Sequence, residues 1–268
     1  MSIWNHLLCR GRMIHKKCRV TDVPYLRSGN VYRYKVPDEK VRWSVEFPEY
    51  DPPDYTDPKM LGRAWADPAE IQAGMFKWNA VDGKVNRVSF VSDYAFDSTL
   101  RPINPIGRTG LRGRGVLGRW GPNHAADPLV TRFKNGKLQF VAIKRSDTGE
   151  WAIPGGMVDA GEQVSQTLQR EFSEETLGGK ARSELNDLWQ HGRELYKGYV
   201  DDPRNTDNAW METVCVNFHD SKGLLDQVEL QAGDDAVNVR WVAEDSNEPL
   251  YASHEDFIAL LKQHHGIK

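Results

Sequence analysis

Three glutamates, Glu171, Glu174 and Glu175, fall within five residues of one another. The stretch 162–176 contains neither glycine nor proline, so it is predicted to form a helix. At about 100° per residue, the three carboxylates lie within an arc of about 100°, one turn deep. Carboxylates arranged in this way could hold a divalent cation together, because Mg²⁺ prefers oxygen ligands.

The adjacent edge of the same helix is apolar, with Val164, Leu168 and Phe172 at helical spacing, and is expected to anchor the helix in a core. Like charges four residues apart cost roughly a few tenths of a kcal/mol per pair on an isolated helix. A solvated acidic face is the simpler alternative. A bound cation would remove the repulsion, and substrate phosphates usually supply further ligands to Mg²⁺.

The polar residues around this helix favour the metal site over a solvated face. Glu162 follows Gly156 by six residues, and Arg170-Glu171-Phe-Ser-Glu174-Glu175 comes eight residues later. This spacing resembles the Nudix box, the loop–helix–loop that holds metal and diphosphate in Nudix hydrolases. Two positions depart from the box: Phe172 replaces an aliphatic residue, and Leu177 stands where a glycine is expected.

The resemblance implies an α/β Nudix fold, with a mixed β-sheet between helices, and a Mg²⁺ cofactor, with Mn²⁺ as the alternative. It implies metal ligands at the Gly156 carbonyl and at four carboxylates, Glu162, Glu171, Glu174 and Glu175. The catalytic set it implies is Glu171, Glu174, Glu175 and Arg170. Arg170 is expected to pair with Glu162 and to fix the loop, rather than to touch substrate.

Composition places the chain among soluble, intracellular proteins. It has 268 residues, a formal net charge of −3 and only three cysteines. The charge argues against a protein that coats nucleic acid, the sparse cysteines suggest a reducing compartment, and no apolar run is long enough to span a membrane. Residues 1–20 are basic and acid-poor, which makes them a candidate targeting segment, against a plain disordered or surface-lying terminus.

The remaining chain is predicted to form a small loop-rich N-terminal domain, 21–126, and a Nudix core, 127–268. In the first, Val41–Phe47 alternates like an edge strand or an isolated hairpin. In the core, strands are expected over 138–144, 194–200, 211–218 and 237–242, and a last helix is expected after Ser253. A monomer is expected.

A glycine–arginine segment without acidic residues covers 98–126. Glycine lets the backbone approach a ligand, and guanidinium groups match phosphate geometry, so Arg108, Arg112 and Arg114 are candidates for binding a diphosphate. A flexible basic linker and an RNA-binding segment are the alternatives.

Several sequence segments that flank the box resemble the ADP-ribose pyrophosphatase branch, which is often mitochondrial. They are residues 107–115, 118–127, 151–157 and 196–210. They also resemble the Nudix homology domain of the ADP-ribose-gated melastatin-type channel. The resemblance implies hydrolysis of ADP-ribose to AMP and ribose 5-phosphate, in mitochondria or the cytosol. Candidate substrate-binding residues are Asp127, Asp207, Asn208, Trp210, Asp234 and Asp235, although the residues of 201–208 alone favour a surface turn.

A channel sensor that binds ADP-ribose without cleaving it is the main rival. Loss of the box carboxylates would be expected of such a sensor, and this chain keeps them all. An RNA-binding protein would leave the carboxylate cluster unexplained. The general base stays open between Glu174, Asp207 and Asp234.

Overall fold

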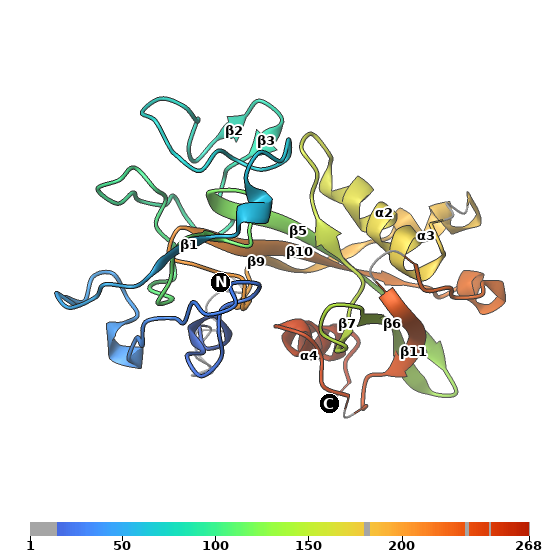
Figure 1. Cartoon of the computed structure of the whole chain (residues 1–268). Coiled ribbons are helices and arrows are strands. Elements are labelled where there is room, and N and C mark those ends of the chain that lie inside the picture. The colour runs from blue at the N-terminus through green and yellow to red at the C-terminus, as the bar shows by residue number, and fades with distance from the viewer. Residues whose placement is uncertain (1–14, 180–182, 234–235, 247, 268) are drawn as a thin grey trace. The chain divides into compact units, whose positions relative to one another are not determined.

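The computed structural model describes residues 15–179, 183–233, 236–246 and 248–267 (Figure 1). The chain divides into two compact units: the first comprises residues 1–123 and 198–212, and the second comprises 124–197 and 213–268. The single linear boundary expected after Ala126 does not anticipate the return of 198–212 to the first unit. Contacts between residues far apart in the sequence hold this segment there, because Asp201 accepts hydrogen bonds from the backbone N–H groups of Lys16, Lys17 and Cys18.

The first unit is built from loops and very short elements. Strand β1 (Asp54–Thr56) pairs in parallel with β4 (Arg112–Gly115), and β2 (Val81–Asp82) forms a small hairpin with β3 (Val85–Asn86). Short 3₁₀ turns cover Lys17–Arg19, Asp38–Lys40 and Pro58–Met60. A buried aromatic cluster of Tyr94, Tyr199 and Trp210 forms a core.

One expectation for this unit and one of the open alternatives are wrong. Val41–Phe47 forms turns instead of a strand, because Trp43 and Phe47 pack their rings around the Arg108 guanidinium at 4.7 and 5.7 Å. The glycine–arginine segment is no flexible linker. Gly107 and Gly110 have φ of +144° and +84°, and a side chain at either would strike a backbone carbonyl, so glycine is needed there for close packing.

His15 is buried in the first unit and should make its stability depend on pH. Its Nε2 faces the Arg108 carbonyl and so carries the proton, while Nδ1 accepts from the Tyr199 hydroxyl. Burial lowers the pKa of His15 from 6.5 to about 3, so the unfolded chain takes up this proton first as the pH falls. The stability contributed by neutral His15 is therefore complete above pH 6.5 and declines progressively as the pH falls toward 3.

We expect His15 protonation to cost about 2 kcal/mol of stability at pH 5 relative to neutral pH. Denaturant unfolding at pH 7.5 and 5 measures this change. His15→Gln should lose less stability over the same interval than the wild type, and His191→Gln, which alters an exposed histidine, should behave as the wild type. An equal loss in His15→Gln and wild type would contradict the assignment.

The second unit contains a seven-stranded sheet in the order β11-β6-β5-β10-β9, to which β7 and β8 add at β6 and β5. The strands are β5 (Gly121–Lys134), β6 (Lys137–Arg145), β7 (Trp151–Ala152), β8 (Gly156–Met157), β9 (Arg193–Tyr199), β10 (Ala209–His219) and β11 (Ala236–Ala243). The ladders β11–β6 and β6–β5 are antiparallel. The ends of β5, β9 and β10 cross the division between the units.

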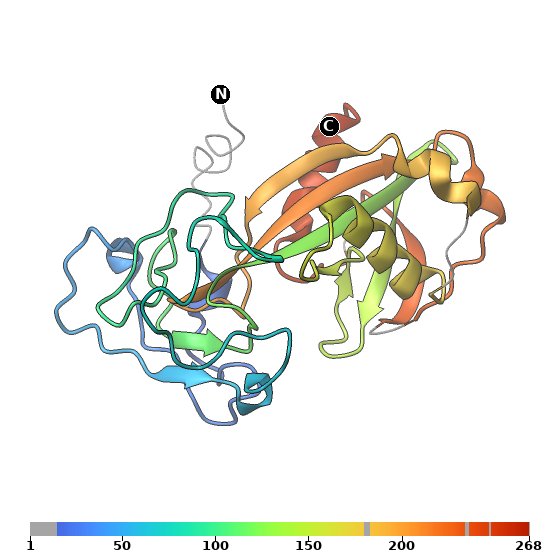
Figure 2. The same ribbon diagram turned by 90° about the horizontal axis from the view of Figure 1, so that it is seen from above.

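Helices cover both faces of this sheet. Helix α2 (Val164–Thr176) lies on one face and α4 (His254–His264) on the other, as Figures 1 and 2 show. Leu168 and Phe172 of α2 join the larger apolar cluster, and short turns at Ser183–Leu185, Asn186–Trp189 (α3) and Leu224–Gln227 close it. The expected sheet between helices is confirmed. Among the described residues, no helix is long and apolar enough to cross a membrane.

Helix α2 also explains the departure at Leu177. Leu177 has φ −121° and is buried in the larger cluster, so its position needs a side chain. The left-handed residues that end the helix are Gly178 and Gly179, with φ of +60° and +74°. The glycine turn is therefore present one residue later, and Leu177 anchors it.

Candidate active site

The four carboxylates expected at the site lie in the second unit, three on α2 and one in the loop before it. Glu171 and Glu175 are buried, Glu162 is half-buried, and Glu174 is the most exposed, with 38% of its side chain accessible. The helix begins cleanly because Gln163 and Gln166 form a reciprocal capping box. The apolar edge of α2 then sets the rotation that directs the glutamates away from the core.

Arg170 forms ion pairs with three of these four carboxylates. Its Nε and Nη2 each donate to Glu162 at 2.9 Å, which confirms the expected pairing, and Nη2 also reaches the Met157 carbonyl. Its Nη1 donates to Glu171 at 2.8 Å and to Glu174 at 3.0 Å. The hydrogen bonds from Arg170 hold the pKa of Glu162 down at about 2. Arg170 therefore fixes the loop and screens the acidic edge of α2.

Burial has the opposite effect on the other two glutamates. It raises the pKa of Glu171 to about 7 and that of Glu175 to about 8, even though Glu175 accepts a hydrogen bond from the Gly155 N–H at 2.9 Å. Burial outweighs the Arg170 charge at Glu171 and the Gly155 hydrogen bond at Glu175, so both carboxylates favour the neutral form more than an exposed glutamate does. This is the electrostatic setting that a divalent cation would stabilise.

The loop before α2 approaches the carboxylates closely because it has two glycines. A Cβ on Gly156 would lie 2.4 Å from a Glu171 oxygen, and a Cβ on Gly155 would lie 2.3 Å from Asp127 Oδ1 and 2.8 Å from the Ala126 carbonyl oxygen. Only glycine lets this backbone lie directly against the acidic edge. Gly156 also pairs with Ala126 in the β5–β8 ladder, which fixes the loop to the sheet.

Gly156→Ala is expected to lower kcat at least about 10-fold with little loss of stability, because the new methyl group meets the end of the Glu171 side chain rather than backbone. Gly155→Ala is the matched comparison. Its methyl group meets a backbone carbonyl, so it should lower the melting temperature clearly. Steady-state kinetics and thermal unfolding of both variants measure the difference. Full activity in Gly156→Ala would contradict the close approach.

The donor set fits a hard divalent cation. Glutamate oxygens from one helical turn and a glycine loop that admits a carbonyl supply oxygen ligands, and burial disfavours the charge of Glu171 and Glu175 in the absence of a cation. In the described part of the chain, no three acidic, histidine or cysteine side chains already surround one metal position. The reason is local, because Arg170 holds Glu162, Glu171 and Glu174 in ion pairs with which a cation would compete.

The candidate diphosphate-binding arginines lie in different environments of the first unit. Arg108 is buried among aromatic rings and donates to the carbonyls of Lys40 and Arg42. Arg112 is half-exposed and pairs with Asp51. Arg114 is fully buried and donates to the Gly118 carbonyl at 2.7 Å. Substrate contact stays a prediction for all three.

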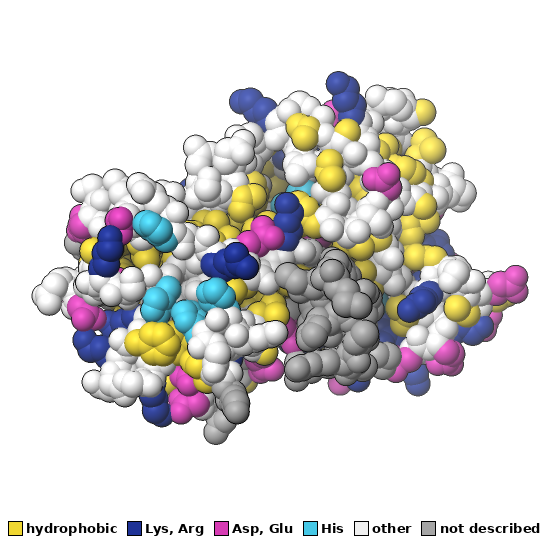
Figure 3. Space-filling model, turned by 180° about the vertical axis from the view of Figure 1, so that it is seen from behind, with side chains coloured by type: hydrophobic (Ala, Val, Ile, Leu, Met, Phe, Trp, Pro, Cys, Tyr) yellow, Lys and Arg dark blue, Asp and Glu magenta, His cyan; other side chains and the backbone are white. Residues whose placement is uncertain are grey.

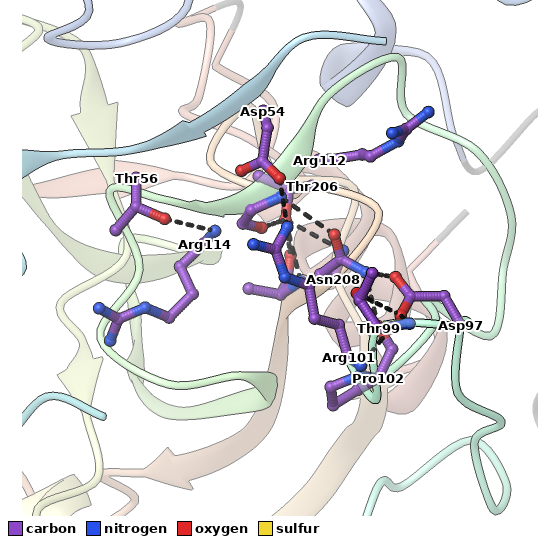
Figure 4. A network of polar contacts seen from close by, with 12 residues as sticks. Asp54, Thr56, Asp97, Thr99, Arg101, Pro102, Arg112, Arg114, Thr206 and Asn208 are labelled. Carbon is purple, nitrogen blue, oxygen red and sulfur yellow. Dashed lines mark hydrogen bonds and ion pairs between the residues drawn. The ribbon is translucent and has the colours of Figure 1, made fainter. Parts of the chain in front are cut away.

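The loop 201–208 is a buried polar network, and the expectation of an exposed surface turn is wrong. Asp207 accepts from the Tyr50 hydroxyl at 2.6 Å and from Thr109 at 2.7 and 2.9 Å. Asn208 accepts from the Gly113 N–H and donates to Asp97 and to the Pro102 carbonyl (Figure 4). These bonds hold the glycine–arginine segment in place.

Burial also argues against the ribose and adenine contacts expected of two residues in this region. Asp207 is 2% exposed, and Trp210 is completely buried, with its ring against Tyr94 and its Nε1 donating to Glu212. Neither offers a free group to a nucleotide. Asp127, in the second unit, is buried beside Gly155 and accepts from Thr213 Oγ1 at 2.6 Å. Asp234 and Asp235 lie outside the described residues.

Two hydrogen-bond donors at the site were not predicted from the sequence. Gly155 donates to Glu175, and Thr167 donates to Glu162 Oε2 at 2.7 Å. Thr167 lies five residues after Glu162 and one turn before Glu171 on the same helix. Its position gave a usable signal, because a hydroxyl at that spacing can reach the loop.

Family models match both parts of the chain. The model described as NUDIX domain matches residues 123–261, and the one described as NUDT9-like, N-terminal domain matches residues 36–121. The chain is 66% identical, over 94% of its length and 98% of the relative's, to a Caenorhabditis elegans protein named "Putative nudix hydrolase 6". It is 50% identical to the mitochondrial ADP-ribose pyrophosphatase of Rattus norvegicus, over 93% of this chain and 78% of that one.

A channel relative also matches. The transient receptor potential cation channel subfamily M member-like 2 of Nematostella vectensis is 48% identical over 90% of this chain, which spans only 17% of the channel. Among solved structures, the NUDIX domain of Shewanella oneidensis NrtR complexed with ADP ribose is 20% identical, with a TM-score of 0.43, over 54% of this chain and 89% of that one. A bifunctional NMN adenylyltransferase/ADP ribose pyrophosphatase from Francisella tularensis, complexed with AMP and a Mn ion, is 21% identical, with a TM-score of 0.42, over 54% and 42% of the chains.

Proposed function

Because the chain belongs to the NUDIX family and carries a NUDT9-like N-terminal domain, we propose that it hydrolyses the diphosphate bond of ADP-ribose to AMP and ribose 5-phosphate. The choice of ADP-ribose as substrate is supported by the 50% identity to an ADP-ribose pyrophosphatase along 93% of this chain. The reaction is supported by the acidic edge of α2, where Glu171 and Glu175 lie against the glycine loop and Glu174 lies on the same helix.

A divalent cation, Mg²⁺ or Mn²⁺, would activate a water and neutralise charge on the departing phosphate when bound. Glu171 and Glu175 are proposed to hold it, with Glu174, Glu162 and the Gly156 carbonyl as further ligands. Arg170 keeps Glu162 ionised and holds it beside the Met157 carbonyl. The Gly155 N–H orients Glu175 through its 2.9 Å hydrogen bond.

Glu174 is proposed to accept the proton of the attacking water. It is the most exposed of the three helix glutamates, so water reaches it directly. Asp207, the other described candidate, is buried and engaged by Tyr50 and Thr109, which leaves it no access to a reacting water.

A non-catalytic sensor is the second candidate, and the 48% identity to a channel favours it. The retained carboxylates favour hydrolysis instead, since a sensor has no need of them. An RNA-binding role has less support. The glycine–arginine segment is folded into the first unit, and on the face in Figure 3 the Lys and Arg side chains are scattered among acidic ones.

Incubation with ADP-ribose and Mg²⁺ tests the proposal, with AMP and ribose 5-phosphate separated by chromatography. Both products should form in equal amounts, and chelation of the metal should abolish them. Binding without release of AMP would support the sensor. Faster cleavage of NADH or coenzyme A would keep the hydrolase and change its substrate. Retention of RNA at physiological salt, without binding of ADP-ribose, would support the RNA-binding role.

We further propose a monomer that acts in mitochondria. The compartment is supported by the name of the Rattus norvegicus relative and by the basic, acid-poor residues 1–20. Fractionation of cells that express the full chain tests the compartment, and light scattering of the purified protein tests the oligomeric state.

A further inference from the structure

Arg114 carries a buried charge that the protein does not fully satisfy. The residue is completely buried in the first unit, its Nη1 donates to the Gly118 carbonyl, and its guanidinium lies 5.4 Å from the Trp120 ring. Its Nε and Nη2 have no hydrogen-bond partner among the described residues. Figure 4 shows the side chain pointing away from the network around Asp54, Arg101 and Asn208.

The carboxylate that acts on Arg114 is already engaged by other arginines. Asp67 accepts hydrogen bonds from Arg87 and Arg119 and also acts electrostatically on Arg114. Asp82 pairs with Arg87. Both carboxylates are therefore engaged by Arg87 or Arg119, and in the described part of the chain neither accepts a hydrogen bond from Arg114.

A buried charge without a partner is expensive, and replacing it by an apolar residue of similar size is often neutral or stabilising. Burial lowers the pKa of Arg114, which reports the same cost. The other two candidate diphosphate-binding arginines differ. Arg108 leaves only its Nε without a partner and is packed among rings and carbonyls, and Arg112 pairs with Asp51. Arg114 thus keeps two donors in a fixed fork, the geometry that binds a phosphate group bidentately.

We propose that Arg114 and Arg119 form an anion site of the first unit that takes a phosphate group. Arg119 retains 21% of its side-chain exposure and gives the site its access to solvent. Trp65, which is 52% exposed and packs against Gly118, flanks the same turn. The assignment of the phosphate to a nucleotide or sugar phosphate rests on the proposed function, whereas the anion site itself does not.

Thermal unfolding of the full chain tests the site, and EDTA is included so that no hydrolysis occurs. The melting temperature is measured with inorganic phosphate, ribose 5-phosphate or AMP, and sodium chloride of equal ionic strength is the control. Phosphate should raise the melting temperature of the wild type by about 2 °C or more at saturation. Arg114→Met should abolish this rise and should itself melt no lower than the wild type without phosphate. Arg119→Gln should weaken the rise, and Lys35→Gln, which alters an exposed lysine of the first unit, should leave it unchanged.

A phosphate-dependent rise that survives in Arg114→Met would overturn the site, as would an equal rise with chloride. A lower melting temperature of Arg114→Met without phosphate would assign Arg114 a structural role instead. If that variant does not fold, the phosphate response of Arg119→Gln decides, because a full response excludes the site. The ADP-ribose assay tests the proposed function separately. If the wild type cleaves ADP-ribose but its melting temperature does not respond to phosphate, only the anion site is refuted. If its melting temperature responds to phosphate but it does not cleave ADP-ribose, only the hydrolase is refuted.

Discussion

Glu175→Gln is expected to lower kcat for ADP-ribose about 10³-fold while leaving the protein folded. Glutamine has nearly the same shape as glutamate and can still accept the 2.9 Å hydrogen bond from the Gly155 N–H. What it lacks is the negative charge that a divalent cation requires at this buried position. Steady-state product formation at saturating Mg²⁺ measures the loss.

Although Glu175→Gln should lower the activity, it should not lower the stability of the metal-free protein. Burial raises the pKa of Glu175 to about 8, so a neutral amide avoids the cost that the carboxylate carries without metal. We therefore expect the melting temperature in EDTA to be unchanged or higher, and the stabilisation by Mg²⁺ to be lost. Glu255→Gln, which removes an exposed carboxylate of α4, should alter neither. Activity of Glu175→Gln within threefold of wild type would remove it from the metal site.

The second unit could be predicted closely because its signals are local. The helix expected over 162–176 spans Val164–Thr176, and the strand expected over 138–144 spans Lys137–Arg145. Hydrophobic periodicity, a glycine loop and glutamates one turn apart all act within about 20 residues of sequence. The pairing of Arg170 with Glu162 followed from the same short range.

The first unit resisted prediction because long-range contacts hold it together. Asp67 meets Arg87 at a separation of 20 residues and the Trp120 N–H at 53, and Asp207 meets Thr109 at 98. No periodicity encodes such pairs. The loop 201–208 shows the consequence: its Asp and Asn content suggested an exposed turn or a ribose site, yet Asn205 and Asp207 are among its buried members.

Asp67→Asn is expected to destabilise the protein by about 3–5 kcal/mol, the cost of removing one partner from a buried ion pair. Asp67 is 3% exposed and accepts from Arg87 at 2.9 and 2.8 Å, from Arg119 at 3.1 Å and from the Trp120 N–H at 2.9 Å. An asparagine offers one oxygen to these donors and turns an N–H group toward the rest. The free energy of unfolding in urea at pH 7 measures the effect.

The pH dependence of that loss identifies its electrostatic origin. Burial by itself would raise the pKa of Asp67, but the hydrogen bonds and charge of Arg87 outweigh it and hold the pKa below its ordinary value. The contribution of Asp67 is therefore complete above the unfolded value, about 3.9, and disappears as the pH falls through the lower folded value. The difference in unfolding free energy between the wild type and Asp67→Asn should therefore become smaller in acid.

Asp51→Asn, which breaks the exposed pair with Arg112, should cost less than about 1 kcal/mol at any pH, because solvent already screens that pair. An equal loss of unfolding free energy in Asp67→Asn and Asp51→Asn would contradict the expectation that burial makes the Asp67 ion pairs contribute more than an exposed pair.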